Sequence, residues 1–66
     1  MPRIRLNGEE RDIDATDVQA LQTELGLAGQ PVAIEVNAAV VPHAQKPDTP
    51  LNPGDRVEIV TLVGGG

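Results

Sequence analysis

The chain contains no cysteine, no phenylalanine, tyrosine or tryptophan, and a single histidine, His43. Without cysteine there can be no disulfide and no thiolate metal site, and one histidine cannot form a zinc site by itself. Because aromatic rings are absent, the core has to be packed from Val, Ile, Leu and Ala. At 66 residues the chain forms one small domain at most.

Positive charge is also scarce, since five Lys and Arg face ten Asp and Glu, for a net charge of −5. Nucleic-acid phosphates require clustered basic side chains, and no ring is available to stack on a base, so we expect no nucleic-acid partner. An acidic surface favours solubility and attraction to a basic protein. No stretch approaches the roughly 20 apolar residues of a membrane span, and the first residues lack a signal-peptide pattern, so we expect a cytoplasmic protein that does not contact a membrane.

The first part of the chain predicts a β-hairpin. Arg3–Leu6 alternates polar and apolar residues, which is typical of a half-buried strand. Asn7–Gly8 favours the positive φ angles of a tight turn. A second, weaker strand follows around Ile13, so residues 3–14 are expected to form a hairpin with its turn near Asn7–Glu10.

The next segment, 16–26, predicts a helix. Thr16 is the expected N-cap, with Gln19 completing a capping box and Asp17 near the positive end of the helix dipole. Gly26 is placed to end the helix in a left-handed conformation. The apolar positions that share one helix face are Val18, Leu21 and Leu25.

The second half predicts three further strands. Residues 32–36 alternate as a strand, Asn37 and Ala38 form a tight turn, and residues 40–41 return as a short strand that ends at Pro42. Residues 43–55 are expected to be loop, because their prolines forbid long regular structure, with a turn at 52–55. The last strand, 56–63, should turn Val57 and Ile59 toward the core. Together these elements predict an α+β fold, a mixed sheet with one helix, and leave the strand order open.

Few residues suggest catalysis. Asp12 and Asp14 are two positions apart and are expected to share a solvated strand face rather than form an acid–base pair. His43 has no Ser or Cys anywhere in the chain to activate as a nucleophile. The terminal glycines do not form a phosphate loop, because no helix follows them. We therefore expect no catalytic residue, no bound metal and no enzyme activity.

The end of the last strand is the remaining candidate site. Arg56, Glu58, Val60 and Leu62 fall on the face away from the helix, where they predict either a partner-docking patch or ordinary exposed residues. The glycines at 64–66 predict either a frayed terminus or a tail that threads a passage too narrow for side chains. Ordering such a tail costs on the order of 1–2 kcal/mol per residue, which a partner would have to offset.

At this point a resemblance adds to the residue patterns. "IRLNGE", "VAIEVNAAVVP", "NPGDRVEIV" and the closing "VGGG" occur in the order found in the ThiS family, among the ubiquitin-like β-grasp proteins that include MoaD. The resemblance implies a β-grasp domain over 1–63, with a mixed sheet of four to five strands packed on one helix, and a flexible glycine tail over 64–66. The proline-rich segment after Pro42 departs from the family pattern.

The resemblance also implies a sulfur carrier role in the biosynthesis of the thiamine thiazole. A ThiF-like E1-type adenylyltransferase, using ATP and magnesium, would adenylate the Gly66 carboxylate while Gly64 and Gly65 thread its active site. Sulfur from a cysteine desulfurase would then convert Gly66 to a thiocarboxylate, which a ThiG-like thiazole synthase consumes. This chain would itself bind no cofactor. Two alternatives remain: a carrier for another pathway (molybdopterin, cysteine or a specialised metabolite), and a β-grasp binding module that carries no sulfur.

Overall fold

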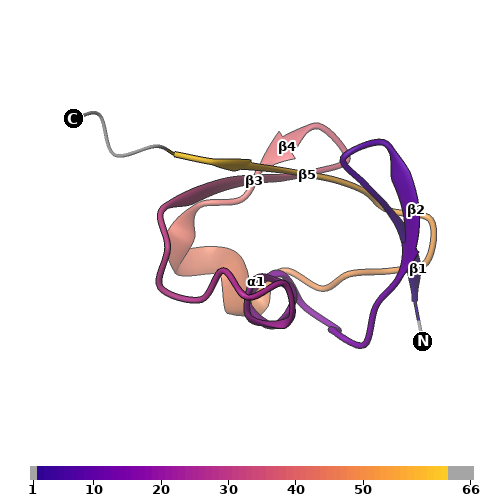
Figure 1. Ribbon diagram of the computed structural model, residues 1–66, viewed down its shortest axis with the longest axis horizontal. Coiled ribbons are helices and arrows are strands. Elements are labelled where there is room, and N and C mark those ends of the chain that lie inside the picture. Colours follow the sequence, from indigo (N-terminus) through magenta and orange to yellow (C-terminus); the bar gives the residue numbers. More distant parts are fainter. Residues whose placement is uncertain (1, 63–66) are drawn as a thin grey trace.

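In the computed structural model, which describes residues 2–62, one helix packs against one face of a five-stranded sheet (Figure 1). In chain order the elements are β1 (Arg3–Leu6), β2 (Glu9–Asp12), α1 (Val18–Glu24), β3 (Val32–Val36), β4 (Ala39–Val40), the 3-10 helix η1 (His43–Asp48) and β5 (Arg56–Thr61). Because residue 1 and residues 63–66 lie outside the described part, the boundary between a 1–63 domain and a 64–66 tail stays a prediction.

The strand order is β2-β1-β5-β3-β4, so the last strand of the chain lies at the centre of the sheet. β5 runs parallel to β1 and antiparallel to β3, which confirms the predicted mixed sheet. The hairpins β1–β2 and β3–β4 form the two sides, and β5 fills the space between them. Sequence periodicity cannot reveal this order, because it reports which face of a strand is buried and not which neighbour the strand pairs with.

Both hairpin turns use left-handed backbone conformations. Asn7 and Gly8 have φ of 48° and 86°, and Asn37 and Ala38 have φ of 51° and 70°, as predicted for tight turns at these positions. The strands next to the turns differ from expectation. β2 spans Glu9–Asp12, so Glu9 and Glu10, expected in the turn, belong to the strand, and Ile13, expected in the strand, lies beyond its end. β4 begins at Ala39 instead of Val40, so the predicted return strand over 40–41 is wrong by one residue.

The helix begins one residue later than predicted. Asp17, and not Thr16, is the N-cap: its backbone is extended and its carboxylate accepts a hydrogen bond from the backbone N–H of Ala20 at 2.8 Å. The reason lies in the distant loop after η1. Asp17 forms a β-bridge with Pro50, and the N–H of Val18 bonds to the carbonyl of Thr49, which holds the chain extended up to Asp17. At the other end Gly26 has φ of 77°, as its predicted role requires.

The segment predicted to be a continuous loop contains the 3-10 helix η1, which includes Pro47. The prediction failed because a 3-10 helix is compatible with proline: the ring fixes φ near −65°, which lies within the range of such a helix. Further along, Asn52–Asp55 forms the predicted turn, with the N–H of Asp55 bonded to the carbonyl of Asn52 at 3.1 Å.

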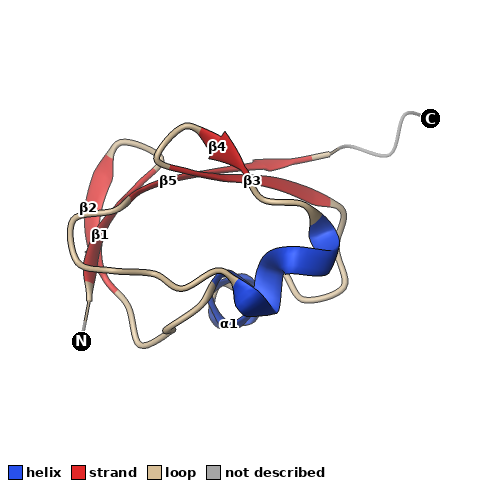
Figure 2. Ribbon diagram, turned by 180° about the vertical axis from the view of Figure 1, so that it is seen from behind, coloured by secondary structure: helices blue, strands red, loops and turns tan. Residues whose placement is uncertain are grey.

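The core lies between α1 and the facing side of the sheet (Figure 2). Val18 and Leu21 from the helix and Val57 from β5 are fully buried, while Leu25 and Ile59 are partly buried against them. Buried residues from the rest of the fold complete this core: Ile4, Ile13, Ala15, Val32, Ile34, Val41 and Leu51. Within residues 2–62, no helix is long and apolar enough to cross a membrane.

Candidate docking surface and the start of the tail

β5 separates the core from the candidate docking surface. Its alternate residues face opposite ways, so Val57 is buried while Arg56, Glu58 and Val60 are exposed. Val60 is 59% exposed and Leu62, one residue beyond the strand, is 52% exposed. The described structure therefore places Arg56, Glu58 and Val60 on the outer surface of the central strand, whereas Leu62, just beyond the strand, also borders a pocket beside α1 and η1.

The strand register adds three residues to this surface. Ala33 of β3 pairs with Val60, Glu35 pairs with Glu58, and Val40 of β4 pairs with Glu35. Residues directly opposite in antiparallel strands share a face, so the surface continues from β5 across β3 to β4. Val40 is itself 69% exposed. These three residues were not predicted for the patch, although the alternation within residues 32–36 already assigns Ala33 and Glu35 to the outward face.

The docking surface, defined as Ala33, Glu35, Val40, Arg56, Glu58, Val60 and Leu62, combines exposed aliphatic side chains with a like-charge pair. Glu35 and Glu58 lie directly opposite each other, and neither forms an ion pair among the described residues. Such a pair is locally destabilising. A basic group from a partner would relieve that repulsion, so the surface is complementary to a partner that presents both cationic and apolar groups.

Two asparagine side chains hold the backbone of β5 in place. The Asn7 amide donates to the carbonyl of Ile59 at 3.3 Å and accepts from the N–H of Ile59 at 2.8 Å. The Asn37 side chain accepts from the N–H of Arg56 at 3.0 Å, and its amide donates to the Asp55 carboxylate at 3.0 Å. β1 pairs with β5 only as far as Val57, so Asn7 continues the pairing where β1 has ended.

The described chain ends at Leu62, whose N–H donates to the carbonyl of Pro31 at 2.9 Å. Together with the pairing of Thr61 and Val32, this bond fixes the last described residues against the beginning of β3. The predicted tail residues Gly64, Gly65 and Gly66 follow this point and lie outside the described residues.

The two predicted aspartates are both exposed, as expected, but they do not share a strand. Asp12, in β2, accepts hydrogen bonds from the Arg3 guanidinium at 2.9 and 3.3 Å. This pairing lowers the pKa of Asp12 and raises that of Arg3. β2 ends at Asp12, and the buried Ile13 beyond it donates its N–H to the carbonyl of Pro2. Asp14 therefore lies beyond the strand.

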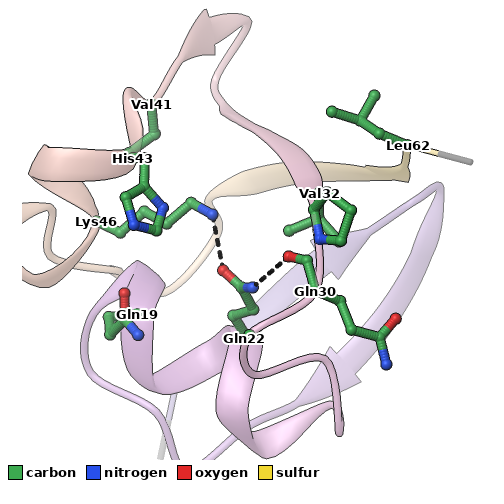
Figure 3. A pocket seen from close by; sticks show the side chains of 10 residues that line it. Gln19, Gln22, Gln30, Val32, Val41, His43, Lys46 and Leu62 are labelled. Atoms are coloured by element: carbon green, nitrogen blue, oxygen red, sulfur yellow. Dashed lines mark hydrogen bonds between the residues drawn. The ribbon is translucent and has the colours of Figure 1, made fainter. Parts of the chain in front are cut away.

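Two further polar features lie elsewhere. The Glu24 carboxylate, on α1, accepts hydrogen bonds from the backbone N–H groups of Asp14 and Ala15, which fastens the segment before the helix to its last turn. His43 is exposed at the start of η1 and lines a pocket together with Lys46 and Gln22 (Figure 3). Among residues 2–62, no three His, Cys, Asp or Glu side chains are grouped as metal ligands.

The strand order, the parallel β1–β5 pair and the single packed helix define a protein of the ubiquitin-like β-grasp class. A solved structure supports this class: the crystal structure of a thiamine biosynthesis protein (ThiS) from Geobacter metallireducens superimposes with a TM-score of 0.82 at 28% identity, over 97% of this chain and 99% of that one. The model of the ThiS family matches residues 4–66. The chain belongs to the ThiS family.

Curated relatives fall into two groups by length. A sulfur carrier protein ThiS from Thermus thermophilus is 36% identical over 63 residues, which is 96% of this chain and 98% of that protein. A thiazole synthase from Paramagnetospirillum magneticum is 42% identical over 65 residues, and a second from Magnetococcus marinus is 38% identical. The chain spans only about 20% of the length of these two thiazole synthases.

Proposed function

We propose that this chain is the sulfur carrier of thiamine thiazole biosynthesis and delivers sulfur as a thiocarboxylate on Gly66. The observation that carries the proposal is the likeness to the Thermus thermophilus sulfur carrier along nearly the whole length of both chains. Two thiazole synthases contain a segment similar to this chain, and this similarity favours a role in thiazole formation over a role in other sulfur-requiring pathways. A ThiG-like thiazole synthase is accordingly the partner that we propose to receive the sulfur.

The proposed chemistry begins with activation of the carboxylate, which is a poor electrophile. A ThiF-like adenylyltransferase uses ATP and magnesium to form an acyl-adenylate on Gly66, and pyrophosphate leaves. The terminal sulfur of a persulfide that the desulfurase has formed from cysteine then displaces AMP from the acyl carbon and gives an acyl disulfide. A thiol reductant cleaves the S–S bond and leaves the thiocarboxylate. This chain binds neither nucleotide nor metal in the scheme, and it acts as a recycled cosubstrate rather than as a catalyst.

The fold supports a scheme in which the partners catalyse the reactions and this chain carries the sulfur. The partner recognises the folded body at the docking surface, where Val60 and Leu62 supply apolar contact area and Arg56 and Glu58 supply charge. The bond between Leu62 and Pro31 fixes the point from which the tail begins. Glycines at 64 and 65 allow that tail to enter a channel that excludes side chains. Fully extended, three glycines reach about 10 Å.

Intact-mass spectrometry tests the proposal directly. The chain is incubated with the adenylyltransferase, ATP, magnesium, cysteine, the desulfurase and a thiol reductant, with ATP omitted as the control. We expect the mass to rise by the difference between one sulfur and one oxygen, and fragmentation to place the change at Gly66. An unchanged mass, under conditions that charge the Thermus thermophilus carrier, would refute the carrier role.

Two tail variants separate carrier from binding module. Deletion of Gly65–Gly66 should abolish thiazole formation while leaving the thermal unfolding of the domain unchanged. Gly66→Ala should cripple adenylation, because a methyl group enters a channel that has no space for it. A truncated chain that retains full function would instead identify a binding module that acts through its docking surface alone.

A further inference from the structure

A pocket of about 320 Å³ lies between α1, η1 and the beginning of β3 (Figure 3). Its walls include the aliphatic side chains of Val32, Val41 and Leu62. Its polar groups include Lys46 from η1 and Gln22 from α1. The volume is within the range of small-molecule sites in proteins, which combine apolar walls with a few placed polar groups.

Lys46 is the unusual member of this pocket, because only 3% of its surface is exposed. Its Nζ donates one hydrogen bond, to Oε1 of Gln22 at 2.8 Å. No carboxylate of residues 2–62 lies within ion-pair distance of it. An ammonium has three N–H donors, and lysine is almost never buried without a partner of opposite charge. The described structure therefore supplies one neutral acceptor to a buried cation.

Gln22 is held in the orientation that this contact requires. Its Nε2 donates to the carbonyl of Leu27 at 2.9 Å and to the carbonyl of Gln30 at 3.2 Å, so its oxygen is the end that faces Lys46 (Figure 3). Two backbone acceptors thus fix the amide, and the amide fixes the ammonium. A neutral amide cannot balance the charge of Lys46. The pocket therefore holds the Lys46 ammonium in a fixed position and supplies no anion to pair with it.

We propose that this pocket binds a carboxylate carried on a short aliphatic stem. The carboxylate accepts hydrogen bonds from the remaining donors of Lys46, and the stem packs against Val32, Val41 and Leu62. A charge-assisted bond in such a sheltered position is about twice as strong as a neutral one. The net charge of −5 repels free anions from the surface as a whole, so binding here depends on the local ammonium. The inference concerns the folded domain and does not depend on sulfur transfer.

The test is an NMR titration of the ¹⁵N-labelled full chain with isobutyrate, at constant ionic strength. We expect saturable shifts at the amides around the pocket, and NOEs from the isobutyrate methyls to the methyls of Val32 and Leu62. Isobutyramide, which has the same shape without the charge, should bind about tenfold more weakly or worse. Non-saturating shifts, equal binding of isobutyramide, or NOEs elsewhere on the surface would each overturn the proposal.

A pair of matched variants assigns the effect to one side chain. Lys46→Gln can still donate to Gln22 but has no charge, and should weaken isobutyrate binding about tenfold or more. Arg11→Gln removes the same charge from exposed β2, outside the pocket, and should bind as the parent does. Equal weakening in both variants would show a general charge effect and refute the site. If Lys46→Gln does not fold, the NOEs in the parent protein still show whether isobutyrate binds in this pocket.

The source of the carboxylate is resolved by a second ligand. N-acetyl-glutamate amide presents the carboxylate as a protein side chain would, whereas isobutyrate represents a free metabolite. A lower dissociation constant for the blocked amino acid than for isobutyrate supports an acidic residue of a partner that covers the pocket beside Leu62. A lower dissociation constant for isobutyrate supports a small free acid as the ligand. Saturation by neither, at concentrations well above the millimolar range, would refute the site.

Discussion

Replacement of Asn7 tests whether one side chain keeps β5 in place. Asn7→Gly removes the two hydrogen bonds between its amide and the backbone of Ile59. Each such bond contributes about 0.5–1.5 kcal/mol, so their loss lowers the free energy of unfolding by about 1–3 kcal/mol. Glycine tolerates the φ of 48° at this position, so the native backbone gains no strain, although the unfolded chain gains entropy worth about 0.4–1 kcal/mol.

The expected decrease in the free energy of unfolding is large relative to the total stability of the protein. At about 0.05–0.15 kcal/mol per residue, a chain of 66 residues has a total stability of about 3–10 kcal/mol. Urea denaturation followed by circular dichroism measures the change, and the midpoint should fall while the m-value stays constant. A shift of less than about 0.5 kcal/mol, the range of ordinary surface substitutions, would refute the reasoning that Asn7 extends the pairing of β5.

Asn7→Asp supplies the internal control. It keeps an oxygen for the N–H of Ile59 but places a second oxygen where the amide donated to the carbonyl of Ile59. This repulsion should raise the pKa of the introduced carboxyl in the folded state, so the destabilisation is present at neutral pH and relieved as the pH falls and the carboxyl is protonated. A stability gap that is independent of pH would contradict the assigned geometry.

Three further substitutions test separate contacts. Arg3 lowers the pKa of Asp12, so Asp12→Asn should be less stable than the parent at neutral pH, and the gap should close as the pH falls through that lowered pKa; a gap that persists in acid would contradict the pairing. Glu58→Lys should stabilise the fold by about 0.2–1 kcal/mol, because it replaces the repulsion of Glu35 by attraction, with Glu58→Gln intermediate in thermal melts. Glu24→Ala should lower the free energy of unfolding by about 0.5–2 kcal/mol in urea, whereas Glu24→Gln, which still accepts, should lose less.

Local features of the fold could be predicted because they follow from neighbouring residues. The Asn7–Gly8 turn, the outward face of β5 and the left-handed Gly26 each depend on chemistry within a few positions of the chain. The N-cap could not be assigned in the same way. Thr16 and Asp17 are both good capping residues, and the choice is made by Thr49 and its neighbour from the loop after η1.

The candidate docking surface, too, could be predicted only where it depends on neighbouring residues of the chain. The patch on β5 followed from alternation within one strand, but Val40 and Glu35 join it only because β4 and β3 pair next to β5 in a particular register. The burial of Lys46 had no local signal, since a lysine between prolines normally indicates an exposed loop. It arises because η1 packs on α1 at the position of Gln22.

If the chain carries an activated carboxyl group, as we propose, the burial of Lys46 has a chemical consequence. Acyl-adenylates react with primary amines, and Lys46 is the only lysine of the chain. Only 3% of Lys46 is exposed and its amine lies inside the pocket, bonded to Gln22, so a small carboxylate can reach it but the bulky adenylate of another copy cannot. In the proposed role, many carriers can wait in the activated state side by side without becoming cross-linked through lysine, and the activated group is kept for the sulfur donor.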